Sequence, residues 1–421
     1  MPTKTELLCK VGPGTAMNKL GKQFWLPIFR SEAVEAGGKP ERIELLGEKY
    51  ILWRAEDNRL GFFDEACPHR LASLALGRNE DCALTCIYHG WKFGVDGKVI
   101  DLPSEPEHLR KKRAEMVKLK HFAVREVNGI VWVFLGDQDN IPSFPEFEFN
   151  LLKPEQVLGL RAEVNGNWLP TLEAGIDPAH LNFLHNGHTE KIDKDDKMAD
   201  WALIEKHTPE YKFKTTEYGF TEAAIRRPDD GTVYIRKRHV ILPFLAFVPF
   251  QKGMTHLAIA SIPVNDKRCI HWIINYTEAD NIVEEIARQT KLSEDAPMIN
   301  LNNYAEGMGT EETLWDQDRE FMKEHWSGIR GPLPWEDIVV AESMGEVDHS
   351  KEFLGDTDFV IMKTRRAILK MLEQVENGED LSIIGSRFAD LSKLRSIALR
   401  LPGEVDWMSI DGKNPPQEAD G

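Results

Sequence analysis

The spacing of apolar residues along the chain changes twice. Between residues 25 and 140, short runs rich in β-branched and aromatic residues alternate with turn signals, at 42–45, 50–54, 60–63, 82–87 and 130–135. This pattern predicts a small all-β domain. Strand-like runs return at 211–213, 221–226, 232–241, 257–262 and 269–276, and helical spacing follows at 281–292, 311–325, 338–344, 360–377 and 387–400. Strands followed by helices predict an α+β fold for the second part, with a sheet that grips a helix.

This pattern divides the chain into four segments. Residues 1–24 form an amino-terminal arm with a short helix at 17–24, and residues 25–140 form the all-β domain. Pro142, Pro145 and Pro154 mark residues 137–160 as a linker. The α+β domain covers 141–410, and we expect the polar tail 411–421 to be disordered.

Composition and charge narrow the class of protein. The 421 residues are 42% hydrophobic and 29% charged, as in ordinary globular proteins. A net charge of −17 argues against nucleic acids and anionic membrane surfaces as partners. The first residues lack the apolar core of a secretory signal, and the longest apolar run, 240–250, is interrupted by Pro243 and Pro249. We therefore expect a cytoplasmic protein without a membrane span.

Two short motifs in the first domain carry metal-ligand residues. Cys67-Pro-His69 is followed after sixteen residues by Cys86-Ile-Tyr-His89. Two thiolates and two imidazoles are the ligands of a Rieske [2Fe–2S] cluster, in which histidines replace the cysteines on one iron. Zinc is the alternative metal, but a zinc finger takes its cysteines from one element and its histidines from the next. Here each loop supplies one of each, which favours the cluster.

The other cysteines have a different expected task. Five cysteines at uneven spacing do not suggest a disulfide framework. Cys9, Cys82 and Cys269 lie outside both motifs. Cys82 is near the second motif in sequence, and we expect it to be a buried structural thiol.

A second candidate metal site lies between residues 177 and 185. Asp177 and Pro178 suit the start of a helix, so the sequence predicts a short buried helix that carries His180 and His185. Side chains five residues apart point about 140° apart on a regular helix, so one ion can bind both only if the helix ends or widens between them. Two imidazoles and a carboxylate form the facial triad of non-haem Fe(II) oxygenases. The alternative is a core helix with two incidental histidines.

The third ligand of such a site cannot be chosen by spacing. A carboxylate from the carboxyl-terminal part is required. Four candidates remain open at this point: Asp316, Asp318, Asp337 and Glu342.

The two motifs in this order resemble the α subunit of Rieske non-haem iron aromatic-ring oxygenases. The second motif reads Glu173-x3-Asp177-x2-His180-x4-His185. The segments Leu46-Gly-Glu48, Pro103-Ser-Glu-Pro106 and Glu342-Ser-Met-Gly345 are similar to the phthalate dioxygenase branch, which also contains O-demethylases of lignin-derived aromatics. The resemblance implies a Rieske domain, a helix-grip catalytic domain with carboxyl-terminal helices, and iron bound by His180, His185 and Asp337.

The same resemblance implies an assembly. In this family the aspartate that matches Asp177 links a cluster histidine of one subunit to an iron histidine of the next, here His89 and His180. A head-to-tail contact of this kind closes into a ring, so we expect a homotrimer or a dimer of trimers. The chain has no Gly-x-Gly-x-x-Gly motif, so NADH and flavin are expected on a separate reductase, with or without a ferredoxin.

A basic cluster points to the substrate. It consists of Arg226, Arg227, Arg236, Lys237 and Arg238. In a strand, Arg236 and Arg238 share one face, and a guanidinium suits a carboxylate, so we expect an aromatic acid as substrate. A solvated strand face is the alternative reading.

These observations leave three classes of function. The first is an oxygenase that uses O2 either to cis-dihydroxylate a phthalate-type acid or to O-demethylate a methoxylated aromatic acid. The second is a Rieske electron carrier, which has no use for His180 and His185. The third is a zinc-stabilised binding module.

Overall fold

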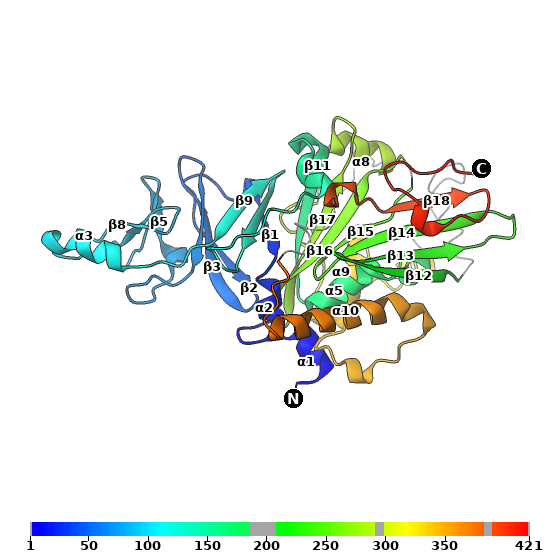
Figure 1. Ribbon diagram of the computed structural model, residues 1–421, viewed down its shortest axis with the longest axis horizontal. Coiled ribbons are helices and arrows are strands. Elements are labelled where there is room, and N and C mark those ends of the chain that lie inside the picture. The colour runs from blue at the N-terminus through cyan, green and yellow to red at the C-terminus, as the bar shows by residue number, and fades with distance from the viewer. Residues whose placement is uncertain (1, 186–207, 252, 291–298, 383–389, 420–421) are drawn as a thin grey trace.

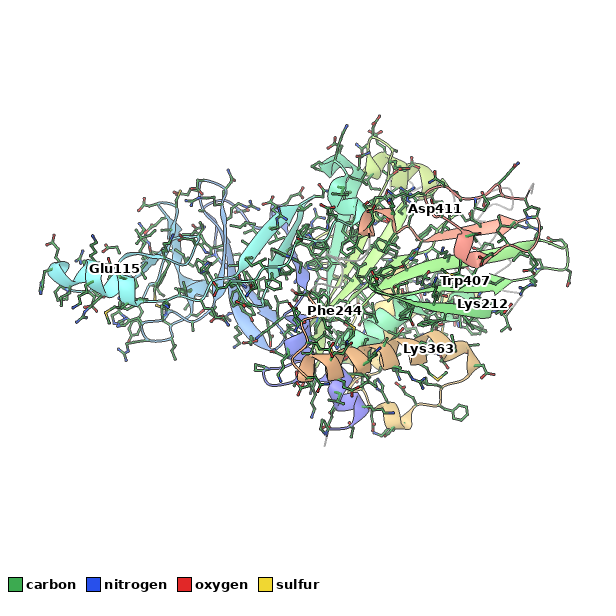
Figure 2. All side chains as sticks on the ribbon, in the orientation of Figure 1. Glu115, Lys212, Phe244, Lys363, Trp407 and Asp411 are labelled. Carbon is green, nitrogen blue, oxygen red and sulfur yellow. The ribbon has the colours of Figure 1, made fainter. Side chains whose placement is uncertain are left out.

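The computed structural model describes residues 2–185, 208–251, 253–290, 299–382 and 390–419. The molecule is elongated, with a β-rich amino-terminal part at one end and a large sheet with helices at the other (Figure 1). The side chains labelled in Figure 2 mark these ends, with Glu115 on one and Lys212 on the other. The arm contains α1 (Lys4–Cys9) and α2 (Ala16–Gly21). Thr3 and Glu6 form a capping box that begins α1.

The amino-terminal domain consists of three small antiparallel sheets. Their strand orders are β1-β10-β9, β2-β3-β4 and β5-β6-β7-β8. The elements are β1 (Trp25–Arg30), β2 (Glu41–Leu45), β3 (Glu48–Arg54), β4 (Leu60–Asp64), β5 (Arg78–Glu80), β6 (Ala83–Thr85), β7 (Lys92–Phe93), β8 (Val99–Asp101), α3 (Glu107–Met116), β9 (Ala123–Val127) and β10 (Ile130–Phe134). Trp53, Phe63 and Phe93 are fully buried and form part of the core beneath the two cysteine loops.

The second domain is built on one antiparallel sheet of eight strands. The order is β11-β17-β16-β15-β14-β13-β12, and β18 pairs with β14 beside β15. The strands are β11 (Val157–Val164), β12 (Glu210–Thr216), β13 (Gly219–Arg226), β14 (Val233–Ile241), β15 (Leu245–Val248), β16 (His256–Asn265), β17 (Arg268–Tyr276) and β18 (Ile397–Leu401). The expected α+β organisation is confirmed.

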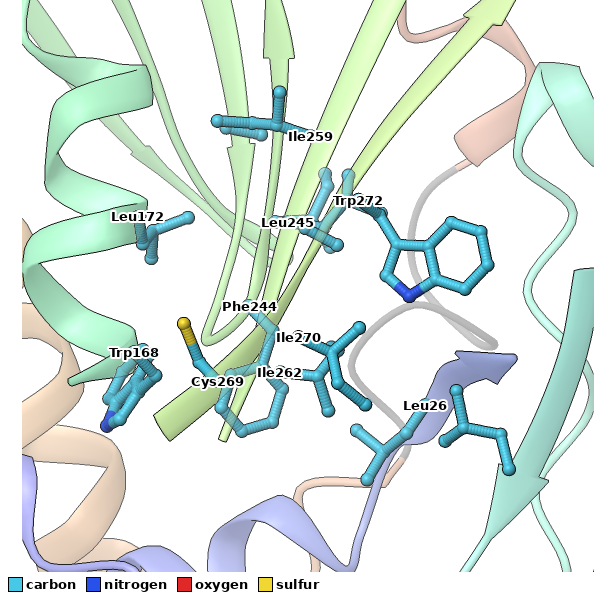
Figure 3. Close-up of a cluster of buried hydrophobic side chains, with 14 of the residues drawn as sticks. Leu26, Trp168, Leu172, Phe244, Leu245, Ile259, Ile262, Cys269, Ile270 and Trp272 are labelled. Atoms are coloured by element: carbon cyan, nitrogen blue, oxygen red, sulfur yellow. The ribbon is translucent and has the colours of Figure 1, made fainter. Parts of the chain in front are cut away.

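Helix α5 (Trp168–Ile176) lies across β15, β16 and β17. Trp168 and Leu172 pack on the sheet residues Ile259 and Cys269, whereas Leu26 of β1 packs on the other side of the sheet near Trp272 (Figure 3). A Cβ atom at Gly175 would lie 1.8 Å from Ile259 Cδ1, so a larger residue there would displace the Ile259 side chain. Packing in the core therefore fixes the distance of α5 from the sheet and the direction of its axis.

The remaining helices partly follow the sequence pattern. They are α4 (Glu148–Leu151), α8 (Ile282–Thr290), α9 (Pro334–Ser343) and α10 (Phe359–Glu376). The last three agree with the predicted helices. None of the helices in the described ranges is long and apolar enough to cross a membrane.

Four expectations about local structure were wrong. Residues 311–325 form the short 3-10 helices Glu311–Asp316 and Phe321–Lys323 instead of one helix, because Leu314 and Trp315 have positive φ. Part of the helix expected at 387–400 is strand β18, which gains hydrogen bonds from β14; residues 383–389 lie outside the described ranges. The tail is ordered as far as Ala419, whose amide donates to Arg400 O. Cys82 is only half-buried, in a turn between β5 and β6.

Candidate metal centres

Two turns bring the four predicted cluster ligands together. The amide of Cys67 donates to Ala72 O at 2.8 Å, and the amide of Cys86 donates to Trp91 O at 2.8 Å, so each turn is closed by a backbone hydrogen bond. Gly90 has φ +73° and a Cβ there would lie 2.7 Å from Pro103, which explains the glycine after the second motif. Both cysteines are buried, whereas both histidines are partly exposed.

The imidazole rings of the two loops are in contact with each other. The ring centroids of His69 and His89 are 4.4 Å apart, and Trp91 stacks on His69 at 4.4 Å. His89 Nδ1 is buried without a hydrogen-bond partner. Burial raises the pKa of Cys67 to about 11, an effect that the amides of His69 and Arg70 oppose. Two inward thiols and an unpartnered inward imidazole nitrogen fit a bound cationic group, which would hold the thiols as thiolates.

The segment after α5 differs from the predicted helix. Asp177 ends α5 instead of beginning a helix, with φ −76° and ψ 121°. Its carboxylate accepts the amides of Ala179 at 2.7 Å and His180 at 3.2 Å, which starts a single 3-10 turn, His180–Asn182. The backbone therefore leaves regular helix before the first histidine. This change of direction removes the 140° separation that a continuous helix would impose.

Three side chains converge as a result. His180 Nε2 and His185 Nε2 are 3.1 Å apart, and Asp337 Oδ1 lies 3.5 Å and 3.2 Å from them. Three ligands about 2.1 Å from one ion and at right angles to one another stand about 3.0 Å apart. Asp337 Oδ1 is buried, and no hydrogen bond satisfies it. The triangle therefore has the size and the acceptor atoms of a facial metal site.

Of the four carboxylates that the sequence left open, only Asp337 lies in this group. Glu342 accepts from Asn165 N and Trp315 Nε1, and Asp318 is paired with Arg330. Asp337 belongs to the first turn of α9, which begins with Pro334 at a favourable helix position.

Each histidine of the triangle has a carboxylate near its Nδ1 atom, on the side of the ring away from the triangle. His180 Nδ1 is 3.4 Å from Asp177 Oδ2, and His185 Nδ1 is 2.7 Å from Glu336 Oε2. Such carboxylates hold a ligand imidazole in the tautomer whose other nitrogen is free for the metal. Burial disfavours charge on His185, but Asp337 and Glu336 outweigh burial and raise its pKa to about 9. The site thus attracts positive charge.

Sequence reasoning missed Glu336. It is buried, and Ser327 Oγ donates to its second oxygen, with His325 Nδ1 3.6 Å from that oxygen. The only signal in the sequence was that Glu336 is next to Asp337. Successive residues of a helix point about 100° apart, so two neighbouring carboxylates can reach different atoms of one site.

Two arginines hold α5 in place. Arg365 of α10 contacts Glu173 through Nε at 2.6 Å and Nη2 at 2.7 Å, a bidentate pair one turn before Asp177. Arg238 of β14 donates to Ile176 O, the last carbonyl of the helix, and pairs with Glu222 at 3.4 Å. These contacts fix the position of Asp177.

The predicted basic cluster is divided between two faces of the sheet. Arg226, Arg236 and Arg238 share a buried face, which looks toward the histidine segment because Leu181 packs on Tyr234 of the same face. Lys237 points to the other face and donates to Ile410 O at 2.5 Å. Arg227 lies at the surface, paired with Glu404 and Glu210.

A cavity of about 400 Å³ opens beside Asp177, His180 and Asp337. Its other walls come from α5, α9, α10 and the segment between α9 and α10, which includes Phe353 and Leu354.

Both halves of the chain match known domain families. The Rieske [2Fe-2S] domain family matches residues 24–125, and the family described as LigXa C-terminal domain like matches residues 133–420. A Rieske domain joined to a helix-on-sheet domain with a His2Asp group is the architecture of a Rieske oxygenase.

Curated relatives agree over nearly the whole chain. The 3-chlorobenzoate-3,4-dioxygenase oxygenase subunit of Comamonas testosteroni is 33% identical, with 96% of this chain and 95% of that protein covered. The phthalate 4,5-dioxygenase oxygenase subunit of Pseudomonas putida is 31% identical, with 98% and 95% covered. The 5,5'-dehydrodivanillate O-demethylase oxygenase subunit of a Sphingobium species is 26% identical, with 90% and 81% covered.

Solved structures share the fold. A carbazole-bound oxygenase in complex with ferredoxin, from carbazole 1,9a-dioxygenase, has a TM-score of 0.55 at 18% identity, with 87% of this chain and 91% of that chain covered. The chain belongs to the Rieske aromatic-ring-hydroxylating oxygenases, as the terminal oxygenase (α) subunit.

The role of Glu336 can be tested by removing its charge. Glu336→Gln keeps the side-chain shape, and we expect the affinity of the His180, His185 and Asp337 group for Co2+ or Fe2+ to fall about 10- to 100-fold. The measurement is chelator competition on protein with an intact cluster. Glu342→Gln is the matched control, because Glu342 is a buried carboxylate of the same helix whose partners are Asn165 and Trp315. Equal losses of affinity in both variants would contradict this role.

Proposed function

We propose that this chain holds one Rieske [2Fe–2S] cluster and one mononuclear Fe(II), and that it hydroxylates an aromatic carboxylate with O2. Cys67, His69, Cys86 and His89 bind the cluster, and His180, His185 and Asp337 bind the iron. The observation that carries the proposal is the triangle of His180, His185 and Asp337, with sides of 3.1–3.5 Å, in a chain that also has a Rieske domain. Neither an electron carrier nor a zinc-stabilised module needs both sites.

When bound, the cluster supplies single electrons, and the iron supplies open coordination positions at which O2 is activated. The protein's own groups prepare these sites. Glu336 accepts a hydrogen bond from His185 Nδ1, and Asp177 faces His180 Nδ1, so that both imidazoles present Nε2. The buried face of the sheet opposite this segment is cationic and suits an acid.

The relatives support an acid as substrate. Two of them are named for 3-chlorobenzoate and phthalate, which are aromatic carboxylates. The preferred reaction is cis-dihydroxylation of a phthalate-type acid. The O-demethylation of a methoxylated aromatic acid is the second candidate, favoured by the relative named for 5,5'-dehydrodivanillate. Arg236 and Arg238, which share the buried face of β14, are the candidates to contact the carboxylate.

Electrons enter from a separate protein. A separate reductase binds NADH and flavin. In a three-component system, a ferredoxin transfers the electrons from the reductase to this chain. One structural neighbour was solved with ferredoxin bound. Inside the assembly, His89 of one subunit passes electrons through Asp177 to His180 of the next. This route requires a head-to-tail homotrimer, or a dimer of trimers.

The reaction is tested by a product screen. The purified chain is supplied with NADH and a reductase of a related system, and it is offered phthalate, chlorobenzoates and methoxylated benzoates. We expect a cis-dihydrodiol from one of these acids and about three irons per chain. Release of formaldehyde would indicate the demethylase. His185→Ala serves as the control and should retain only the cluster iron. A wild-type protein with cluster iron alone would refute the proposal.

The electron route is tested at Asp177. Asp177→Asn keeps the side-chain shape and the oxygen that accepts the Ala179 amide, but it removes the negative charge next to His180. We expect product formation to fall about 100-fold while iron content and chemical reduction of the cluster stay normal. The measurement is stopped-flow reoxidation of the reduced cluster in the presence of substrate and O2. A reoxidation rate equal to that of the wild type would exclude Asp177 from the route.

The substrate contact is tested on two neighbouring residues. Arg236→Met removes a cation from the buried face, and Lys237→Met removes one from the opposite face of the same strand. A charge-assisted hydrogen bond contributes about 1.5–3 kcal/mol, so KM for the acid should rise at least 10-fold in Arg236→Met only. The same KM change in both variants would show that Arg236 does not bind the carboxylate.

A further inference from the structure

Two buried polar side chains of the second domain have no hydrogen-bond partner among the residues that the structure describes. Gln251, which follows β15, is 7% exposed, and both the oxygen and the nitrogen of its amide are buried and unpartnered. Tyr234 of β14 is fully buried, and its hydroxyl is also unpartnered. A polar group that is removed from water without a partner lowers the stability of the fold. Two such groups on one surface therefore call for a bound partner.

The sheet places both groups beside Arg236. Arg236 pairs with Ala398 of β18, and Ala398 forms a parallel bridge to Gln251, so these three residues form one row across the sheet. Residues opposite each other in such a row point to the same face. Tyr234 lies two residues before Arg236 on β14 and therefore shares this face. Neighbouring strands lie about 4.8 Å apart, so the backbones of Arg236 and Gln251 are roughly 10 Å apart, with only the methyl group of Ala398 between them.

This row lies against the histidine turn. Leu181, which follows His180, packs on Tyr234 and Ala398. The unpartnered amide and hydroxyl are therefore on the face of the sheet that looks toward two of the candidate iron ligands. A substrate that reacts at the iron site has to lie in this part of the domain.

The two groups have a defined chemical preference. The amide of Gln251 offers two donors and an acceptor, and the hydroxyl of Tyr234 offers one donor and acceptor capacity. Neither side chain carries a positive charge, whereas a carboxylate is best matched by a guanidinium. The amide and the hydroxyl together suit an uncharged oxygen substituent, which is a hydroxyl or a methoxyl group on an aromatic ring.

We propose that Gln251 and Tyr234 bind a hydroxyl or methoxyl substituent of the aromatic acid whose carboxylate is held on the Arg236 face. This inference rests on the proposed function and adds a second point at which the substrate is held. Two points of attachment fix the orientation of the ring as well as its position, and so determine which carbon faces the iron ligands. Gln251 and Tyr234 are then specificity-determining residues.

A buried water molecule is the competing occupant. Water also offers donors and acceptors, and a buried water typically makes about three hydrogen bonds to groups such as these. A water that stayed in place would contribute equally to the binding of every acid. Discrimination between acids with and without the ring oxygen therefore separates the two occupants.

The inference is tested by binding to the holoenzyme without oxygen, so that no turnover occurs. Benzoate is compared by calorimetry with its hydroxy and methoxy derivatives at each ring position and with phthalate. We expect one hydroxy or methoxy acid to bind at least about 10-fold more tightly than benzoate, because benzoate leaves the amide and the hydroxyl unpaired. In Gln251→Met and in Tyr234→Phe this advantage should fall to about 2-fold or less, whereas the affinity for benzoate should stay the same.

Tyr218→Phe is the matched control. Tyr218 is also buried, but its hydroxyl is bonded to His239 Nδ1 at 2.8 Å, and His239 points to the opposite face of β14. This variant should keep the preference of the wild type. Gln251→Met and Tyr234→Phe should also melt at the wild-type temperature or above it, because each replaces an unpartnered buried polar group by an apolar one of similar shape. A lower melting temperature in both would show that these groups support the fold and would contradict the proposal.

The remaining outcomes separate this inference from the proposed function. A preference for the ring oxygen that survives in both variants would overturn the inference, as would equal binding of benzoate and all its derivatives by the wild type. Tightest binding of phthalate, unchanged in both variants, would assign a second carboxylate to the pocket and overturn the inference while the acid substrate stands. Failure of every acid to bind would refute the acid substrate and the inference together.

Discussion

The candidate iron site depends on the point at which α5 ends. A helix that continued through His185 would direct the two imidazoles about 140° apart, and no single ion could bind both. Asp177 prevents this, because its carboxylate accepts the amides of Ala179 and His180 and starts a tight turn. The same carboxylate lies 3.4 Å from His180 Nδ1. One side chain thus ends the helix, orients a metal ligand and, in the proposed assembly, connects the neighbour's His89 to His180.

This turn brings the two histidines to one point only if α5 itself is held in place. Three kinds of contact hold it: Asn167 caps its first turn, Arg365 grips Glu173 in its last turn, and Arg238 binds its terminal carbonyl. Arg238 is anchored in the central sheet and Arg365 in α10. Buried ion pairs contribute little net stability, but breaking one leaves a charge without compensation, so they specify one arrangement strongly. The histidine turn is therefore positioned by charged contacts from both sides.

The sequence predicted the cluster loops and the two histidines because their ligands lie close together in the chain. Residue spacing could not choose Asp337, which only the family resemblance implied, and Glu336 was missed, because α9 reaches His185 only through the tertiary fold, about 150 residues later. It also misassigned the local backbone. Asp177 and Pro178 are favourable at a helix start, but Asp177 is used at a helix end, where its carboxylate begins the next turn. The helix expected near residue 400 became β18, because the exposed edge of β14 offered it hydrogen bonds.

In the proposed electron route, the activity is a property of an assembly. The cluster loops belong to the part of the molecule near β5 and β8, whereas α5 and α9 lie beyond β1 and β3 in the other domain (Figure 1). The proposed electron route therefore runs from His89 of one copy to Asp177 of the next. On that route, surface residues that would be neutral in a monomer matter for catalysis, because electrons pass only between docked copies. The net charge of −17 would make two copies repel at long range. The contact that the proposed route needs must therefore be held by short-range interactions that outweigh this repulsion.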